Sequence, residues 1–299
     1  DIVEMTGENR VLAFYGIRVI NESPRVGLKA LIEKSGKQTP LTITDVVFGI
    51  APRINAAGRI EHGKRAVQLL IETNESKAKD FAEGIENHNT ERKELDQNIT
   101  KEALEMIDDS KKSTVVYSSD WHKGVVGIVA SRLIENYYKP TIVLSEKDGE
   151  LTGSARSVKG FNLYDALLQC EHLLEKFGGH KYAAGLTLKK ENLRTFINEF
   201  EKVVSRTITT DQLVAEIEVD LEIDIDEVDD KLYRIIKQFA PFGPKNRTPN
   251  FVSKKVTDCG WGKKVGEDKT HLRLVLNTST EKITAIGFRM ADYFEKTTE

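Results

Sequence analysis

The sequence contains very little cysteine and no long hydrophobic segment. Only Cys170 and Cys259 are cysteines among its 299 residues, and their separation leaves neither a disulfide framework nor a cysteine zinc site. No apolar run approaches the roughly 20 residues that a membrane-spanning helix requires, and no signal-peptide pattern opens the chain. These absences predict a soluble protein of the reducing cytoplasm, with no membrane partner.

Motifs that hold metals or nucleotides are missing as well. Phosphodiester hydrolysis at neutral pH usually uses cations held by clusters of Asp and His, and the sequence has neither a His-x-Asp-x-Asp run nor an Asp-His-His triplet. Asp120 with His122, and Glu61 with His62, are isolated pairs. No Walker loop, GxSxG elbow or GxGxxG is present. We therefore predict no catalytic residue and no metal ligand in this chain.

Charge is nearly balanced overall but divided locally. The 44 basic and 47 acidic residues give a net charge of -3, so a polyanion must be held by local patches. Residues 216–230 contain nine acids and no base, whereas residues 231–289 contain thirteen bases and four acids. This division predicts a basic surface in the C-terminal part of the chain.

The first third of the sequence has helical periodicity. Apolar residues between Asn9 and Ile32 recur at helical spacing, and Pro24 separates two short helices. An apolar helical run follows, for which we expect an end at Pro52 and a turn of small residues at 55–58. From 76 to 107 charges are dense and apolar residues sparse, which predicts a long, solvent-exposed helix connecting two domains.

Residues 111–205 alternate between strand and helix periods, which predicts a compact α/β domain with a mixed sheet. The Asp148-Gly149 pair indicates an antiparallel hairpin. Asn162 resembles the start of a capping box, and we expect its helix to run to Phe177 and end at Gly178 and Gly179. The expected strands are 114–119, 140–145, 151–157 and 183–188, and the other expected helices are 124–138 and 191–204.

The last part of the chain is mostly β by its pattern. Residues 217–225 alternate between apolar and acidic, which predicts a strand with one face of each kind. Further short apolar runs between turns favour a small barrel of the OB type. Candidate groups for stacking on bases, each also suited to a barrel core, are Phe242, Phe251, Trp261 and His271.

The segment GSARS, residues 153–157, combines a hydroxyl, a guanidinium and backbone N–H groups at the end of a hairpin strand. Arg donates in a planar, bidentate manner to phosphate oxygens and Ser adds a short donor, so Ser154, Arg156 and Ser157 are candidates for phosphate binding. The alternative is an arginine that is simply solvated beside a turn, and spacing alone favours that alternative.

The segment FGGHKYAAG, residues 177–185, places His180 after paired glycines. Gly178 and Gly179 suit a helix C-cap, whereas the following small residues would let a ligand approach a strand closely. His180 can donate to a phosphate or sugar oxygen, and a purely structural histidine is equally compatible with the pattern.

Two further segments carry donors. In APRINAAGRI, Asn55 and Arg59 could grip a nucleotide backbone, although a turn in which Arg59 pairs with Glu61 explains the pattern equally well. In DWHKGVVG, His122 precedes a helix whose free N–H groups favour anions. The glycines of this second segment, Gly124 and Gly127, are better explained by tight packing of that helix on the sheet.

Five segments, taken in order, resemble the bacterial RecJ family, the single-strand-specific exonucleases of the DHH phosphoesterase superfamily. They are APRINAAGR, DWHKGVVGIVASR, GSARS, FGGHKYAAG and APFGPKNRTPNF. The resemblance spans nearly the whole chain and implies an α/β plus all-β architecture of four parts. These are the helical end of a DHH domain (1–72), a connector helix (73–110), a mixed-sheet DHH-associated domain (111–205) and an OB-type barrel (206–299). One departure is Lys245, Asn246 and Arg247, where the family often has Gly-Asn-Pro.

The resemblance also implies a function. The family degrades single-stranded DNA from 5′ to 3′ in DNA repair and recombination, with Mn²⁺ or Mg²⁺ held by DHH motifs. Those motifs are absent here, and because the chain begins with Asp1 we expect sequence upstream of it. The implied role is binding of the strand and its 5′ phosphate by a region that is inactive alone. Single-stranded DNA is the implied partner, and a single-strand-binding protein and a helicase are further candidates.

Site residues follow from the matching motifs. The family's 5′-phosphate and backbone contacts correspond to Ser154 and Arg156. Its contacts beside the scissile bond correspond to Gly178, Gly179 and His180, and those on the side of the catalytic domain correspond to Asn55 and Arg59. Ser157 and His122 complete the expected set.

Two other functions remain compatible with the sequence. One is a DHH phosphodiesterase of short oligonucleotides or cyclic dinucleotides, against which the basic β region argues. The other is a non-catalytic protein that binds single-stranded nucleic acid.

Overall fold

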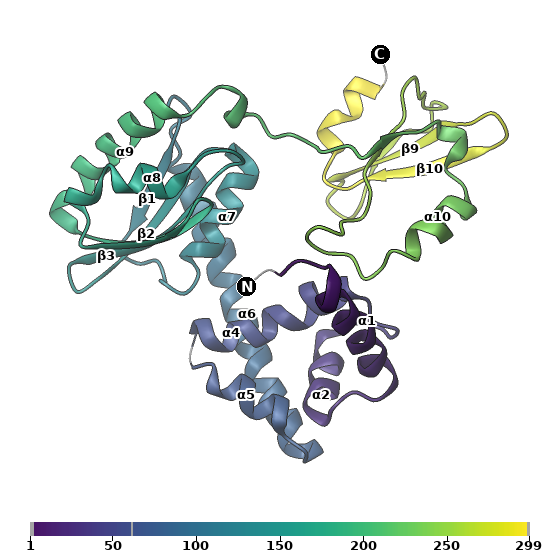
Figure 1. Ribbon diagram of the computed structural model, residues 1–299, viewed down its shortest axis with the longest axis horizontal. Helices are drawn as coiled ribbons and strands as arrows, with labels where there is room; N and C mark the ends of the chain where they lie inside the picture. The colour runs from purple at the N-terminus through teal and green to yellow at the C-terminus, as the bar shows by residue number, and fades with distance from the viewer. Residues whose placement is uncertain (1–2, 61, 298–299) are drawn as a thin grey trace. The chain divides into compact units, whose positions relative to one another are not determined.

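The computed structural model describes residues 3–60 and 62–297 (Figure 1). The chain forms two compact units, one comprising residues 18–216 and the other comprising the residues up to Ile17 together with those from Ile217 onward. Helix α1 (Gly7–Glu22) is divided between them. Within the described ranges, no helix has the length and apolar character that a bilayer crossing demands.

The larger unit begins with helices that pack on one long helix. The structure confirms two helices separated near Pro24, α1 and α2 (Val26–Ser35). Helix α1 has no buried residue, whereas α2 and the helices after it share a core of small and aliphatic side chains, among them the fully buried Leu31, Leu69 and Ile85. The remaining helices of this group are α3 (Ile43–Asp45), a π-helical turn (Val46–Ile50), α4 (Ala51–Ile60) and α5 (Lys64–Ile71).

The predicted turn at 55–58 is wrong, because these residues lie within α4. Pro52 does not end the helix. It is the second residue of α4, after a π-helical turn that ends at Ile50 and in which Ala51 N–H donates to Val46 O, so its missing N–H falls where the α-helical hydrogen-bond pattern is interrupted anyway. Asn55 and Arg59 therefore lie one helical turn apart.

The expected long helix is present as α6 (Glu75–Glu105), begun by the Asn74 side chain, which accepts a hydrogen bond from Lys77 N–H at 3.0 Å. It is less solvated than the charge density predicts. One stripe, which includes Ala82, Ile85 and Ile99, is buried against α2, α4, α5 and α7. Charged residues occupy the rest of the circumference, so the helix is amphipathic.

The predicted mixed sheet is confirmed, with the strand order β1-β2-β3-β5-β4. The parallel pair β1–β2 is connected through helix α7 (Val126–Tyr137), and the other neighbours are antiparallel. The strands are β1 (Thr114–Ser118), β2 (Thr141–Lys147), β3 (Glu150–Arg156), β4 (Lys176–His180) and β5 (Ala183–Lys189).

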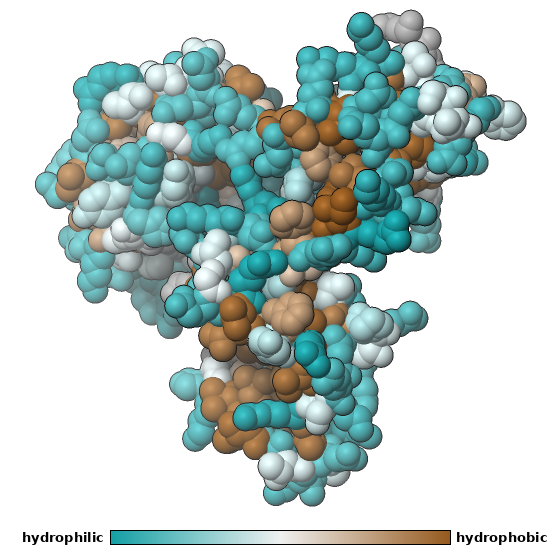
Figure 2. Space-filling model, turned by 45° about the vertical axis from the view of Figure 1, so that its right-hand side comes forward, coloured by the Kyte–Doolittle hydropathy of each residue, from teal (hydrophilic) through white to brown (hydrophobic). Residues whose placement is uncertain are grey.

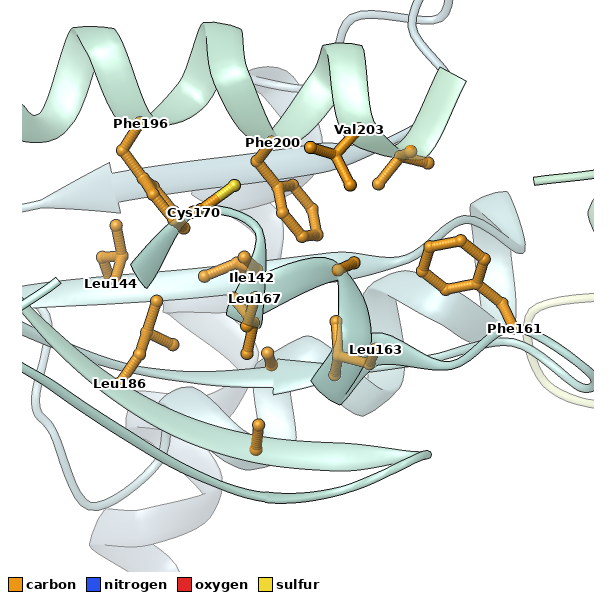
Figure 3. Close-up of a cluster of buried hydrophobic side chains, with 14 of the residues drawn as sticks. Ile142, Leu144, Phe161, Leu163, Leu167, Cys170, Leu186, Phe196, Phe200 and Val203 are labelled. Atoms are coloured by element: carbon orange, nitrogen blue, oxygen red, sulfur yellow. The ribbon is translucent and has the colours of Figure 1, made fainter. Parts of the chain in front are cut away.

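One face of this sheet is filled by helices α8 (Leu163–Leu168) and α9 (Leu193–Thr207). Figure 3 shows Phe196 and Phe200 of α9 pointing toward Ile142 and Leu144 of β2. The two phenylalanine rings stack with centroids 5.9 Å apart, and both side chains are fully buried. Alternate strand residues supply the other side of this core, as the period of two requires.

The prediction of a helix running to Phe177 is wrong. Asn162 does begin α8, accepting a hydrogen bond from Asp165 N–H, but the helix ends at Leu168. Residues Lys176–His180 instead form edge strand β4, which pairs with β5. The paired glycines therefore lie in a strand and do not cap a helix.

The smaller unit contains short strands and little core. A three-stranded antiparallel sheet has the order β10-β9-β8, and β6 pairs in parallel with β7. Of the predicted OB-type barrel, the described residues show these two small sheets. The elements are β6 (Leu221–Glu222), helix α10 (Asp230–Lys237), β7 (Phe251–Val252), β8 (Lys263–Val265), β9 (His271–Asn277), β10 (Lys282–Gly287) and a 3-10 helix (Ala291–Thr297).

Two expectations for this unit need correction. The strand predicted over 217–225 shortens to two residues, and its apolar side is largely uncovered, with Ile217 83% exposed. Helix α10 was not expected. Apolar side chains also reach the surface elsewhere, as the brown patches in Figure 2 show, and on α1 Leu12 is 71% exposed.

Lys245 stands where the resembling family often has glycine, and the structure shows how the turn at this position is formed. Lys245 adopts a left-handed backbone with φ of 61°, a conformation that favours glycine. Asn246 closes the turn, because its amide donates to the carbonyls of Phe239 and Pro241 at 2.9 Å. The Lys245 ammonium pairs with Glu4 at 2.5 Å.

Candidate functional site

The strand register gathers the predicted residues of three strands on one face. Ser154 lies opposite Gly185 and Arg156 opposite Ala183, and on the next strand Gly178 and His180 face the same two partners. Directly opposed residues of antiparallel strands share a face. The partly open face, as we call it, therefore carries Ser154, Arg156, Ala183, Gly185, Gly178 and His180.

Helix α7 covers only part of that face. Its apolar residues pack with Val116 of β1 and Val143 of β2. Over β4 and β5 the surface is open: a Cβ at Gly178 would meet no atom within 4 Å, and one at Gly185 would meet only Gly153 O at 3.9 Å. The result is a flat floor of small residues, to which a ligand can approach closely.

Gly179 has the opposite orientation. A Cβ there would lie 2.3 Å from Ala183 O, and its φ of 150° suits glycine. The two glycines thus differ: the fold requires Gly179, whereas no contact within the fold requires Gly178 to be a glycine.

The Arg156 guanidinium is held at the edge of this floor. Its Nη1 donates to Ser154 Oγ at 2.8 Å and to Ala155 O at 2.9 Å. Burial lowers the pKa of Arg156, and the positive charge of Arg59 lowers it further. A guanidinium is not deprotonated in proteins, so Arg156 brings a partly desolvated positive charge to the site.

Arg59 reaches the site from the last turn of α4. Its Nη1 donates to Gly124 O at 3.0 Å. A Cβ on Gly124 would lie 2.4 Å from Arg59 O, so glycine is what allows α4 to contact the segment before α7. In the same segment His122 Nδ1 accepts a hydrogen bond from Gly124 N–H at 3.1 Å.

The first turn of α7 contacts the hydroxyl and guanidinium. A Cβ at Gly127 would lie 3.2 Å from both Arg156 Nη2 and Ser154 Oγ. Gly127 therefore packs α7 on the sheet as predicted, whereas Gly124 lies before α7 and allows a close approach to α4, not to the sheet. The N-terminus of α7, with its positive dipole end, is thereby close to two phosphate-type donors.

Other predicted residues lie at or beyond this cluster. Asn55 is exposed on α4, and His180 is exposed with Nδ1 accepting from Tyr182 N–H at 3.3 Å. The Ser157 hydroxyl donates to Phe161 O at 3.0 Å in the following loop. Glu61, the alternative partner of Arg59, lies outside the described residues.

Sequence reasoning missed polar residues on α6. The Asp96 carboxylate is fully buried and accepts from Arg132 of α7, with N to O distances of 2.7 to 3.0 Å. Arg92 lies one turn before it and donates to Asn89 Oδ1 at 3.1 Å. Asn89 and Asp96 occupy the same heptad stripe as Ala82 and Ala103, so polar residues at core positions were the available signal.

Among residues 3–60 and 62–297, no group of three or more His, Cys, Asp or Glu side chains could hold a metal ion. The donors at the partly open face are positive or neutral and suit an anion. In the smaller unit Trp261 is 68% exposed and precedes Lys263 and Lys264, and His271 packs edge-on against Phe288 at 5.4 Å.

Comparison with known families gives two matches. Residues 110–206 match the DHHA1 domain, and residues 219–299 match the RecJ OB domain. The class of protein is thus one that joins a DHHA1 domain to a RecJ OB domain.

Individual proteins that are similar to this chain agree with these domain matches. The chain is 34% identical over 302 residues to the single-stranded-DNA-specific exonuclease RecJ of Bacillus subtilis (strain 168), covering 99% of this chain and 38% of that protein. It is 32% identical to the protein of the same name from Haemophilus influenzae, covering 92% and 50% of the two chains. The crystal structure of RecJ with Mn²⁺ from Thermus thermophilus superposes with a TM-score of 0.83 at 28% identity, covering 95% and 42%.

The chain is therefore a RecJ-like protein with a DHHA1 domain and a RecJ OB domain. It spans between about a third and a half of the length of these relatives.

Proposed function

We propose that this chain is the strand-binding portion of a 5′-to-3′ single-stranded-DNA exonuclease, and that the partly open face of its sheet holds the 5′ phosphate. The observation that carries the proposal is the convergence of Ser154, Arg156 and Arg59 beside a floor of small residues. The names of the relatives support single-stranded DNA as the substrate.

Each part of the site has a distinct role in this proposal. The Ser154 hydroxyl and the Arg156 fork donate to oxygens of the terminal phosphate, and Arg59 adds a second guanidinium. Gly178, Gly185 and Ala183 let the sugar-phosphate backbone lie close to the strands. His180, Asn55 and His122 lie at the rim, where they can contact the adjoining nucleotides, while Gly179 shapes β4 and Ser157 the loop after β3.

The RecJ OB domain supplies further grip on the strand. Its lysines interact with phosphates, and the exposed Trp261 offers a face on which a base can stack. Phe242 and Phe251 are half-buried and contribute to packing.

Hydrolysis is not assigned to this chain. Structures of RecJ relatives contain Mn²⁺ or Mg²⁺, but the described residues offer no ligand set that fits either ion. We assign residues 1–72 to the end of a DHH domain, 73–110 to the connector, 111–205 to the DHHA1 domain and 206–299 to the OB domain. A single-strand-binding protein, a helicase and the cytoplasmic location remain predictions.

Fluorescence anisotropy with a 3′-labelled, 5′-phosphorylated oligonucleotide tests the proposal. Replacing Arg156 with Ala removes charge-assisted hydrogen bonds, and we expect binding to weaken by about tenfold or more. Affinity should also fall steeply with salt. Arg194→Ala, an exposed arginine on α9 at the filled face, is the matched control and should bind like the parent chain. Equal affinity of the parent and Arg156→Ala contradicts the proposed phosphate site on the partly open face.

A further inference from the structure

Arg92 is the most unusual charged residue outside the cluster already described. It lies on α6, which packs against both α4 and α7, the helices that contribute Arg59 and Gly127. It is only partly exposed and is flanked on its own helix by two fully buried polar residues, Asn89 and Asp96.

Two hydrogen-bond donors at this position lack an acceptor among the described residues. Arg92 Nη2 donates to Asn89 Oδ1, but Arg92 Nε is buried with no partner, and so is Asn89 Nδ2. Buried donors without a partner are rare in folded proteins. Asn89 is 0% exposed, so the amide and the guanidinium together indicate an acceptor that the protein itself does not supply.

The Asp96 carboxylate, one turn further along α6, already binds another arginine. Both oxygens of Asp96 accept from Arg132, and in the part of the chain that the structure describes neither Arg92 nor Arg156 has an ion pair with a carboxylate. Burial lowers the pKa of Arg92; Asp96 opposes this effect, and the charges of Arg59 and Arg132 add to it. Arg59 lowers the pKa of Arg156 too, so its charge acts on both residues.

Like charges gathered in a partly desolvated place are unfavourable unless an anion neutralises them. A terminal phosphate carries about 1.5 to 2 negative charges near neutral pH, against one for an internal phosphodiester. Three guanidinium groups from α4, α6 and β3 therefore match the end of a strand better than its interior.

We propose that Arg92, braced by Asn89, is a third guanidinium of the terminal-phosphate site together with Arg59 and Arg156, and that it selects 5′-phosphorylated ends. This inference rests on the proposed function, because it assigns a new residue to the same site. Arg92 binds the phosphate, and Arg132 with Asp96 fixes α7 beside it.

The test is the ratio of dissociation constants for a 5′-hydroxyl and a 5′-phosphorylated oligonucleotide of one sequence, both labelled at the 3′ end. We expect Arg92→Gln to reduce this ratio by about tenfold and Arg92→Lys to retain part of it. The control, Lys93→Gln, removes an exposed charge from the same turn and should leave the ratio unchanged.

The outcomes separate the two proposals. If the parent chain shows no preference for the phosphorylated end, the proposed function itself fails. If the parent prefers that end and Arg156→Ala loses the preference while Arg92→Gln keeps it, the assignment of Arg92 is wrong and the phosphate site on the partly open face stands.

A second measurement avoids dependence on how Arg92→Gln folds. In the parent chain, labelled with ¹⁵N at arginine, the Nε–H resonance of Arg92 is identified by its loss in Arg92→Lys. It should shift when the 5′-phosphorylated oligonucleotide is added and not with the 5′-hydroxyl form. Equal behaviour with both oligonucleotides, as expected if only a water satisfies this donor, overturns the inference.

Discussion

The two faces of the five-stranded sheet come from the same alternating strands but have opposite character. On one face Ile142, Leu144 and Leu186 lie under two helices in a continuous apolar core. On the other face β3 presents Ser154 and Arg156 and β5 presents Gly185, and α7 covers β1, β2 and part of β3 but leaves β4 and β5 open. Stability is therefore concentrated on the filled face and binding on the partly open face. Substitutions on each side should separate the two properties.

The largest expected effect is on the filled face. Phe200→Ala removes a fully buried ring that stacks on Phe196, and we expect it to lower the free energy of unfolding by about 3 to 5 kcal/mol. Urea unfolding followed by circular dichroism measures this change. Under conditions where the variant is folded, its affinity for 5′-phosphorylated DNA should equal that of the parent; a large loss of affinity would show that the faces are not independent.

The adjacent glycines Gly178 and Gly179 of β4 allow the two faces of the sheet to be compared with the same substitution at neighbouring positions. Gly179→Ala places a Cβ within 2.3 Å of Ala183 O, so we expect a loss of about 1 to 3 kcal/mol in stability. Gly178→Ala adds a methyl group to open space and should change stability by less than about 0.5 kcal/mol. It should nevertheless weaken DNA binding, because the added methyl group projects from the partly open face and keeps the DNA backbone further from β4. If Gly178→Ala binds normally, the strand does not lie against β4.

Gly127→Ala should separate stability from binding within one substitution. Alanine favours the helix by up to about 1 kcal/mol, but its Cβ would lie 3.2 Å from Arg156 Nη2 and Ser154 Oγ and displace them. We expect unchanged or slightly higher thermal stability with a severalfold weaker preference for the 5′ phosphate. The control is Gly84→Ala on α6, where the nearest atom would be at an ordinary 3.6 Å and binding should not change.

The smallest expected effect concerns pH. The Glu201 carboxylate on α9 accepts hydrogen bonds from Ser113 and Ser205. Burial raises the pKa of Glu201, but these hydrogen bonds outweigh it and hold the pKa below the ordinary 4.5. Because the folded pKa is depressed, this stabilisation is present above the ordinary value and is lost as the pH falls through the folded value.

Glu201→Gln should therefore be less stable than the parent at pH 7, by about 0.5 kcal/mol given its partial exposure. Thermal unfolding at pH 7 and at pH 3 should show this difference shrinking in acid. A difference that grows in acid would contradict the assigned direction. DNA binding at pH 7 should be unaffected, since Glu201 lies away from the partly open face.

Much of the sheet could be predicted from sequence because its strands and crossover helix have clear periods. The errors arose where a non-local partner decides the structure. Gly178 and Gly179 fit a helix end as well as an edge strand, and only pairing with β5 distinguishes the two. Pro52 was interpreted as a helix end because the π-helical turn before it leaves no sequence signal.

For the candidate site, the motifs supplied Ser154, Arg156 and Arg59 but not their arrangement. Register places Ser154 and Arg156 beside Gly185, and the close approach at Gly124 places Arg59. Arg92 was missed because a single arginine in a charge-dense helix looks solvated until its neighbours are known to be buried.

The most direct test of the binding face is photocrosslinking. A 5′-phosphorylated oligonucleotide carrying a diazirine on its first base is irradiated with the protein, and the modified peptides are identified by mass spectrometry. The account predicts crosslinks in residues 150–156 or 176–185, which are competed away by unlabelled 5′-phosphorylated strand. Crosslinks confined to α9 or to the smaller unit would contradict it.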